Sequence, residues 1–172
     1  MANVIDNEVQ AKMALKEVRL YLKENFSIEI LQPVIIKLGQ VQTLDWKSRL
    51  TSGFFHIGNC STKQMGHITA HEITVVPGLE RVKFKSVICH ELTHAFQSEK
   101  RLLRNFKGYK EGMARWTEYH FLLDHQQVEE AQKLRRFEMV ILGKMLNKIL
   151  EFEKEHGREA TSRWLQEMEL ET

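Results

Sequence analysis

The segment CHELTHAF, residues 89–96, constrains this chain more than any other stretch. It contains His90, Glu91 and His94 in the order H-E-x-x-H. On a helix, residues four apart lie on the same face, about 6 Å apart along the axis. Two imidazole nitrogens at this spacing can bind one Zn²⁺ at roughly 2.0–2.1 Å each, and the intervening carboxylate lies beside the ion without having to ligate it. The segment therefore predicts a helix that carries two ligands of one metal ion.

The residues around this motif have the pattern of a half-buried helix. Apolar side chains recur at steps of three and four: Phe84, Val87, Ile88, Leu92, Ala95 and Phe96. The motif residues border this stripe, so we expect the metal site at the edge of the core, in a cleft. There Glu91 is expected to be the catalytic residue, a general base that takes a proton from a water molecule activated by the ion.

A catalytic zinc site needs a third protein ligand. Glu111 is the preferred candidate, because it follows turn-forming residues, opens a second expected helix and has small neighbours that permit close helix packing. Glu118 lies on the same face of that helix and is a candidate to orient the site. A histidine as third ligand would instead give an all-histidine site, and this alternative stays open. The further candidates in this segment are His120, Asp124 and His125.

The motif and the segment EGMARW, residues 111–116, resemble the gluzincins, zinc peptidases whose third ligand is a glutamate on a following helix. Within that group, residues 72–123 resemble the peptidase domain of the ubiquitin-activated, LIM-domain-containing peptidases that limit organ growth in plants. The resemblance implies one Zn²⁺ bound by His90, His94 and Glu111, and hydrolysis of peptide bonds in a protein or peptide substrate. No LIM or ubiquitin-interacting segment is present, so regulation and substrates do not carry over.

Two other functions compete with the peptidase. The chain would be a non-catalytic regulatory or interaction module if it bound zinc without turnover. It would be an SprT-like peptidase, acting on proteins bound to nucleic acid, if a histidine were the third ligand. No Cys-x-x-Cys zinc ribbon follows the motif, which argues against the second alternative. Three residues are candidates to stabilise the oxyanion of the reaction: Tyr109, Tyr119 and His120.

The remaining chain predicts an α+β fold. A helix is expected over Asp6–Asn25, capped by Asp6 or Asn7, and strands over Ile28–Leu38 and Gly66–Val76. We expect the second strand at the rim of the cleft, as in gluzincins, with His67 and His71 exposed or bordering the cleft. Residues 40–66 show no regular pattern, and helices follow residue 126. The prediction is a compact zincin-like fold, with a small, mainly antiparallel sheet packed on the H-E-x-x-H helix and a helical C-terminal half.

Length and composition complete these expectations. A chain of 172 residues predicts one domain, 1–172, with an N-terminal helix and sheet (1–80), metal-site helices (81–125) and C-terminal helices (126–172). Cys60 and Cys89 do not make a disulfide framework, and the N-terminus does not resemble a signal peptide. We therefore expect a cytoplasmic protein without a membrane or nucleic-acid partner. The basic residues between 100 and 110 indicate a solvated helix end or, alternatively, a site for an acidic substrate.

Overall fold

All the described strands lie in the first half of the chain, and the second half is helical. The computed structural model describes residues 4–40, 57–65, 68–103, 107–140 and 145–168. The elements follow in the order β1 (Val4–Ile5), α1 (Glu8–Phe26), β2 (Val34–Leu38), β3 (Gly58–Met65), β4 (Ile68–Val75), β5 (Leu79–Glu80), α3 (Arg81–Lys100), α4 (Lys107–Asp124), α5 (Val128–Val140), α6 (Met145–His156) and α7 (Arg158–Glu167). The predicted α+β class is confirmed.

The larger sheet has the strand order β2-β4-β3. β3 pairs antiparallel with β4, β2 pairs parallel with it, and β1 and β5 form a separate antiparallel ribbon. The sheet is therefore mainly antiparallel, as expected. The predicted strand Gly66–Val76 corresponds to β4, but its expected place at the rim is wrong, because β4 is the central strand. β3 forms the edge instead, and it arises from a stretch that the sequence left without regular structure.

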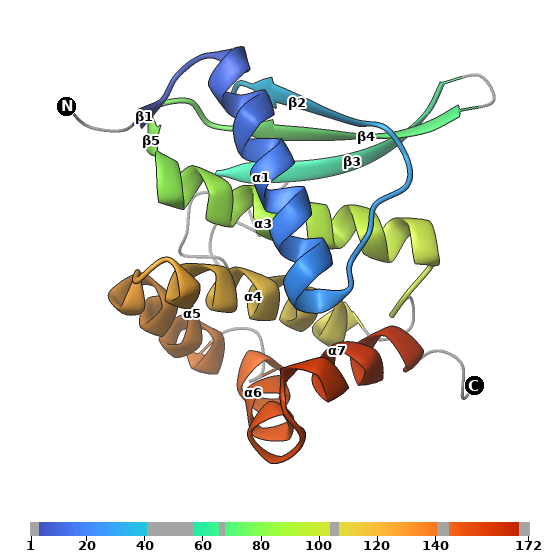
Figure 1. Cartoon of the computed structure of the whole chain (residues 1–172), viewed down its shortest axis with the longest axis vertical. Helices are drawn as coiled ribbons and strands as arrows, with labels where there is room; N and C mark the ends of the chain where they lie inside the picture. The colour runs from blue at the N-terminus through green and yellow to red at the C-terminus, as the bar shows by residue number, and fades with distance from the viewer. Residues whose placement is uncertain (1–3, 41–56, 66–67, 104–106, 141–144, 169–172) are drawn as a thin grey trace.

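Helix α3, which contains the H-E-x-x-H motif, lies between the sheet and α4 (Figure 1). α1 crosses the front of α3 and β2, and the last three helices lie on the far side of α4 (Figure 1). The apolar stripe of α3 is buried as predicted, with Phe84, Ile88, Leu92 and Ala95 each 0% exposed. This packing leaves one side of α3 free to face a cleft between β3 and α4.

Local sequence signals mark the start of α1 and the turn that precedes β5 and α3. Asn7 caps α1, because its side chain accepts a hydrogen bond from the backbone N–H of Gln10 at 3.0 Å. Gly78 has a φ of 84°, a conformation that glycine adopts at little cost, and its N–H donates to the Ile5 carbonyl at 2.9 Å. This turn and the β1–β5 ribbon hold the start of α1 beside the start of α3.

The C-terminal helices support α4 from below. A Cβ on Gly112 would lie 2.9 Å from Met145 Cβ and 3.0 Å from Ile149 Cδ1, so the glycine allows α6 to pack closely on α4. The small residues next to Glu111 thus permit the close packing that the sequence indicated.

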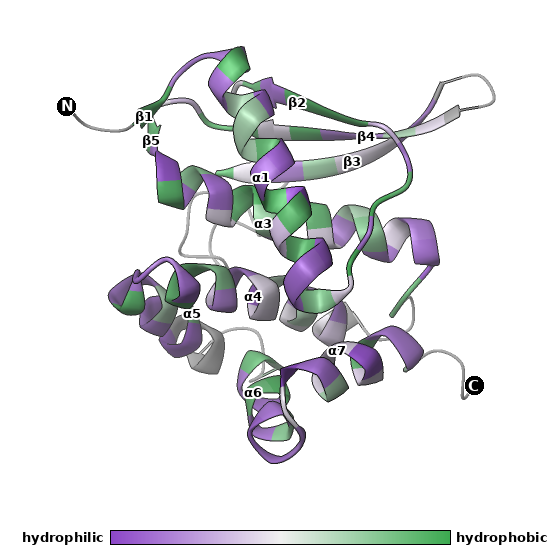
Figure 2. Cartoon of the chain, viewed as in Figure 1, coloured by the Kyte–Doolittle hydropathy of each residue, from purple (hydrophilic) through white to green (hydrophobic). Residues whose placement is uncertain are grey.

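Figure 2 shows α7 as largely hydrophilic, and its residue Leu165 is buried. Among the described residues, no helix has the length and apolar character needed to cross a membrane.

Candidate metal centre

Two helices bring three ligand atoms to one point. His90 Nε2 and His94 Nε2, from α3, are 3.1 Å apart. Glu111, from α4, places Oε1 3.5 Å from His90 Nε2 and Oε2 3.3 Å from His94 Nε2. In a tetrahedral site with bonds of 2.0–2.1 Å, neighbouring donor atoms lie roughly 3.3 Å apart. The three side chains therefore form a group that could hold a metal ion, and no other such group occurs in the described part of the chain.

Hydrogen bonds fix both imidazole rings with Nε2 directed at this point. His90 Nδ1 lies 3.2 Å from Glu118 Oε2, and His94 Nδ1 lies 2.9 Å from Gln97 Oε1. Because Gln97 Nε2 donates to the Lys110 carbonyl at 2.8 Å, its Oε1 is left to accept the Nδ1–H of His94. When the imidazoles are neutral, both rings then present a lone pair on Nε2, the arrangement that metal-binding histidines use.

Glu118 has the role that the sequence indicated. It is 6% exposed, and besides His90 it contacts Ser86 Oγ at 3.4 Å and Lys83 Nζ at 3.7 Å. Burial opposes its ionisation, but the hydrogen bond and charge of His90, with Lys83, hold the pKa of Glu118 below its usual value. A carboxylate at this position keeps the His90 ring in place.

The electrostatics of the group favour a positive charge among the donor atoms. Burial raises the pKa of Glu111, but His90, His94 and Arg115 outweigh it and hold that pKa well below the usual range. Burial lowers the pKa of His90, while Glu111 and Glu118 raise it to about 9. A cation bound at the three donor atoms would take the place of the proton that these carboxylates stabilise on His90.

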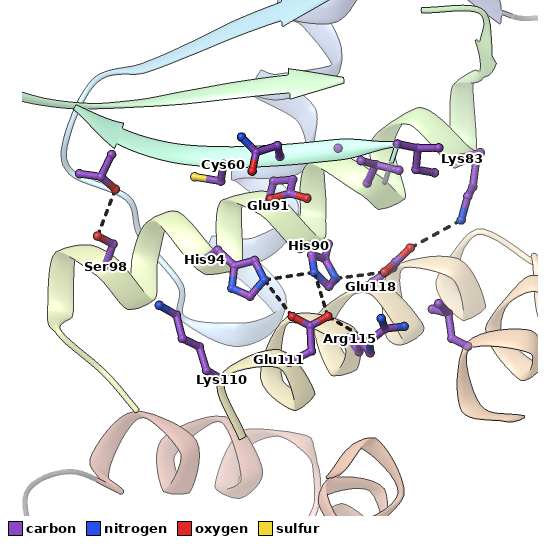
Figure 3. A pocket seen from close by; sticks show the side chains of 16 residues that line it. Cys60, Lys83, His90, Glu91, His94, Ser98, Lys110, Glu111, Arg115 and Glu118 are labelled. Atoms are coloured by element: carbon purple, nitrogen blue, oxygen red, sulfur yellow. Dashed lines mark hydrogen bonds and ion pairs between the residues drawn. The ribbon is translucent and has the colours of Figure 1, made fainter. Parts of the chain in front are cut away.

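Glu91 lies on the side of the two histidines that faces β3, opposite Glu111 (Figure 3). It is 8% exposed, and a Cβ on Gly58 would lie only 3.0 Å from its Oε1. Burial raises the pKa of Glu91, and the charges of His90 and His94 partly offset this. Glu91 thus lies beside the His90, His94 and Glu111 group, and its carboxylate has an increased proton affinity, as a general base requires.

These residues line a cleft of about 470 Å³ between β3 and α4. The wall on the β3 side includes Gly58, Asn59, Cys60 and Thr62. The wall on the α4 side includes Lys110, Glu111, Arg115 and Glu118. No described strand pairs with the outer edge of β3, so its backbone borders the cleft.

The other candidate ligands lie elsewhere. His120 Nε2 is 2.8 Å from Glu153 Oε2, and His125 Nδ1 is 2.8 Å from the Phe121 carbonyl. Asp124 accepts a hydrogen bond from Tyr21 at 2.7 Å. The oxyanion candidates are also outside the lining of the cleft, since Tyr109 packs edge-on against Trp164, and Tyr119 against His120. The all-histidine alternative therefore has no geometric support.

His71 corrects an expectation, because it is fully buried rather than exposed or bordering the cleft. Its Nδ1 lies 3.0 Å from Thr62 Oγ1 and its Nε2 3.2 Å from Glu99 Oε1. Glu99 also accepts the backbone N–H of Gln32 at 2.8 Å, which ties α3 to the segment that precedes β2. His67 falls outside the described residues. Cys89 is a free, fully buried thiol in the core.

Sequence reasoning missed Gln97 and β3. Gln97 lies three residues after His94, so helical spacing places both on one face, and this signal was available. β3 was hidden because Gly58 and Asn59 are typical of a turn, and its sequence GNCSTKQM lacks alternating apolar residues.

No protein-family model, curated protein or solved structure matches the chain.

Proposed function

We propose that this protein is a zinc-dependent metallopeptidase of gluzincin type. The observation that carries the proposal is the convergence of His90 Nε2, His94 Nε2 and the Glu111 carboxylate at 3.1–3.5 Å from one another, with Glu91 beside them. Two histidines and one glutamate are the ligand set of catalytic zinc in peptidases of the thermolysin class, and they leave a fourth position for water or substrate.

When bound, zinc would polarise the scissile carbonyl and lower the pKa of a water molecule towards neutrality. The other tasks fall to residues of the chain. Glu118 and Gln97 hold the two rings in the tautomer that binds a metal. Glu91 accepts the proton of the attacking water on its carboxylate and delivers it to the nitrogen of the leaving amine.

The edge of β3 supplies a means to align an extended peptide. An extended chain can add to a free sheet edge through backbone hydrogen bonds. β3 lies along the cleft beside Glu91, so a peptide paired with it would pass the metal group. We also propose a cytoplasmic location, since both cysteines are free thiols, as is usual in a reducing compartment.

Metal analysis and a peptide-library digest test the proposal together. Protein purified without added metal should contain about one zinc per chain. Glu91→Gln preserves shape and removes the base, so it should keep the zinc and lose roughly 10²–10⁴-fold in rate. Glu80→Gln is the matched control, because Glu80 is exposed, makes no capping hydrogen bond and is not part of the cleft lining.

Two results would count against the enzyme. A zinc content below about half an equivalent per chain after reconstitution would contradict the proposed metal site. Equal cleavage by the wild type and Glu91→Gln would assign the activity to a contaminant. Full zinc content without any cleavage would identify the non-catalytic binding module instead.

A further inference from the structure

The cleft contains three cationic side chains, and among the described residues only Lys83 and Arg115 of these three form an ion pair. Lys83 Nζ lies 3.7 Å from Glu118 Oε1, and Arg115 Nε lies 3.0 Å from Glu111 Oε1. For Lys110, no ion pair occurs within the described ranges. An ammonium group that lines a cleft and is not engaged by a described carboxylate can bind an anionic group of a ligand.

The backbone of Lys110 is held in place, although its ammonium group has no ion-pair partner in the part of the chain that the structure describes. Its carbonyl accepts the Gln97 Nε2–H at 2.8 Å, and the same Gln97 side chain holds His94. The half-buried Lys110 side chain extends along the cleft at the end where Ser98 lies (Figure 3). Its charge also acts on Cys60 of β3, whose pKa burial raises and Lys110 partly lowers. Lys110, on α4, and Cys60, on β3, both line this cleft.

The charge of the whole cleft favours an anionic ligand. Its lining contains the three cations Lys83, Lys110 and Arg115 and the three carboxylates Glu91, Glu111 and Glu118. These charges balance, so a divalent ion on the two histidines and Glu111 would make the cleft positive. Such a cleft attracts acidic segments and repels basic ones.

The direction of β3 places Lys110 relative to the scissile bond. β3 begins at Gly58, which lies against Glu91, and continues to Thr62, whose Oγ1 is 3.1 Å from Ser98 Oγ. Antiparallel pairing is the more stable of the two ladders. A peptide paired antiparallel with β3 runs from the Ser98 end towards Glu91, so the residues before its scissile bond lie at the Lys110 end.

Resting on the proposed peptidase function, we propose that Lys110 is a specificity residue that binds an acidic side chain of the substrate, on the amino-terminal side of the scissile bond. The substrate class is thus a protein or peptide segment with aspartate or glutamate shortly before the cleaved bond. A terminal carboxylate would lie on the other side of the bond, and peptides with a free or an amidated C-terminus distinguish the two sources.

The test compares peptides that differ only by Glu or Gln at single positions before the cleaved bond. The quantity measured is the Glu/Gln ratio of kcat/KM for wild type, Lys110→Met and Lys110→Glu. The wild type should favour Glu roughly tenfold at low salt, since one charge-assisted contact is gained, and less at high salt. The ratio should fall to about 1 in Lys110→Met and invert in Lys110→Glu. Lys16→Glu, an exposed residue of α1, is the matched charge reversal outside the cleft and should keep the wild-type ratio.

A binding measurement keeps this inference separate from the peptidase assignment. Zinc-loaded Glu91→Gln, followed by fluorescence anisotropy with the same labelled peptides, should bind the Glu peptide more tightly, and Lys110→Met in that background should abolish the difference. This result with no cleavage by the wild type would reject the peptidase and support the carboxylate site. Cleavage with a wild-type ratio near 1, a preference that survives Lys110→Glu, or a preference only for free C-termini would each overturn the inference and leave the peptidase standing.

Discussion

Replacing Gly58 by alanine tests the contact between β3 and α3. A Cβ at this position would overlap Val87 Cγ1 and would lie 3.0 Å from Glu91 Oε1 and 3.2 Å from Glu91 Cγ. Val87 is 4% exposed and packed in the core, so it cannot move aside freely. Overpacking of this kind costs about 1–3 kcal/mol. For a chain of this size the melting temperature should fall by roughly 2–12 °C.

Thermal unfolding monitored by circular dichroism measures this cost. Gly39→Ala is the matched control, because its Cβ would meet Thr74 Cγ2 at an ordinary 3.6 Å. It should stay within about 1 kcal/mol of the wild type. In a Val87→Ala background the overlapping methyl group is absent, so Gly58→Ala should cost less, with a coupling of about 1 kcal/mol or more.

The same variant connects packing to the proposed chemistry. If β3 moves away from α3, the peptide bound along it moves relative to Glu91, and kcat/KM should drop roughly tenfold or more. The zinc content should not change, since no ligand is touched. The close approach of β3 to α3 would be refuted by two results together. Gly58→Ala would have the same melting temperature as Gly39→Ala, and its effect on stability would be the same with and without Val87→Ala.

Four further predictions concern single side chains. Glu111→Ala should lower zinc affinity by well over the roughly 10–100-fold typical of residues that only support a ligand, while His120→Ala keeps the zinc; retained zinc in the first variant would overturn the ligand set. Glu118→Gln should weaken zinc binding by about 10–100-fold in a competition titration with a chelator, and an unchanged affinity would contradict its support of His90. Burial raises the pKa of Glu153, but hydrogen bonds from His120 and Trp116 hold it below its ordinary 4.5, so its stabilising contribution is present above that pH and is lost as the pH falls below it. Glu153→Gln should therefore flatten the acid limb of a stability–pH curve, and an identical limb would argue against a stabilising role of these hydrogen bonds. Burial raises the pKa of Cys60 to about 12, so alkylation by iodoacetamide at pH 8 should be much slower in the native protein than in denatured protein, as mass spectrometry can show.

Features that depend on residues close in sequence were predictable. The spacing of His90, Glu91 and His94 and the apolar stripe beside them follow from the helical repeat alone. Asn7 caps α1 through a residue three positions away, which is again a local interaction. The choice of Glu111 as third ligand agrees with the geometry, although the sequence could not exclude a histidine.

Features that depend on contacts between distant segments were decided by the tertiary structure. His71 looked exposed from its strand pattern, but its partner Glu99 is 28 residues away and buries it. The rim of the cleft belongs to β3 rather than β4, because strand order depends on pairings that no local pattern specifies. Within the described ranges, Lys110 lines the cleft without an ion-pair partner, and this could also not be read from the sequence. It depends on how α3, α4 and β3 pack together, because this packing pairs Lys83 with Glu118 and places Lys110 in the cleft.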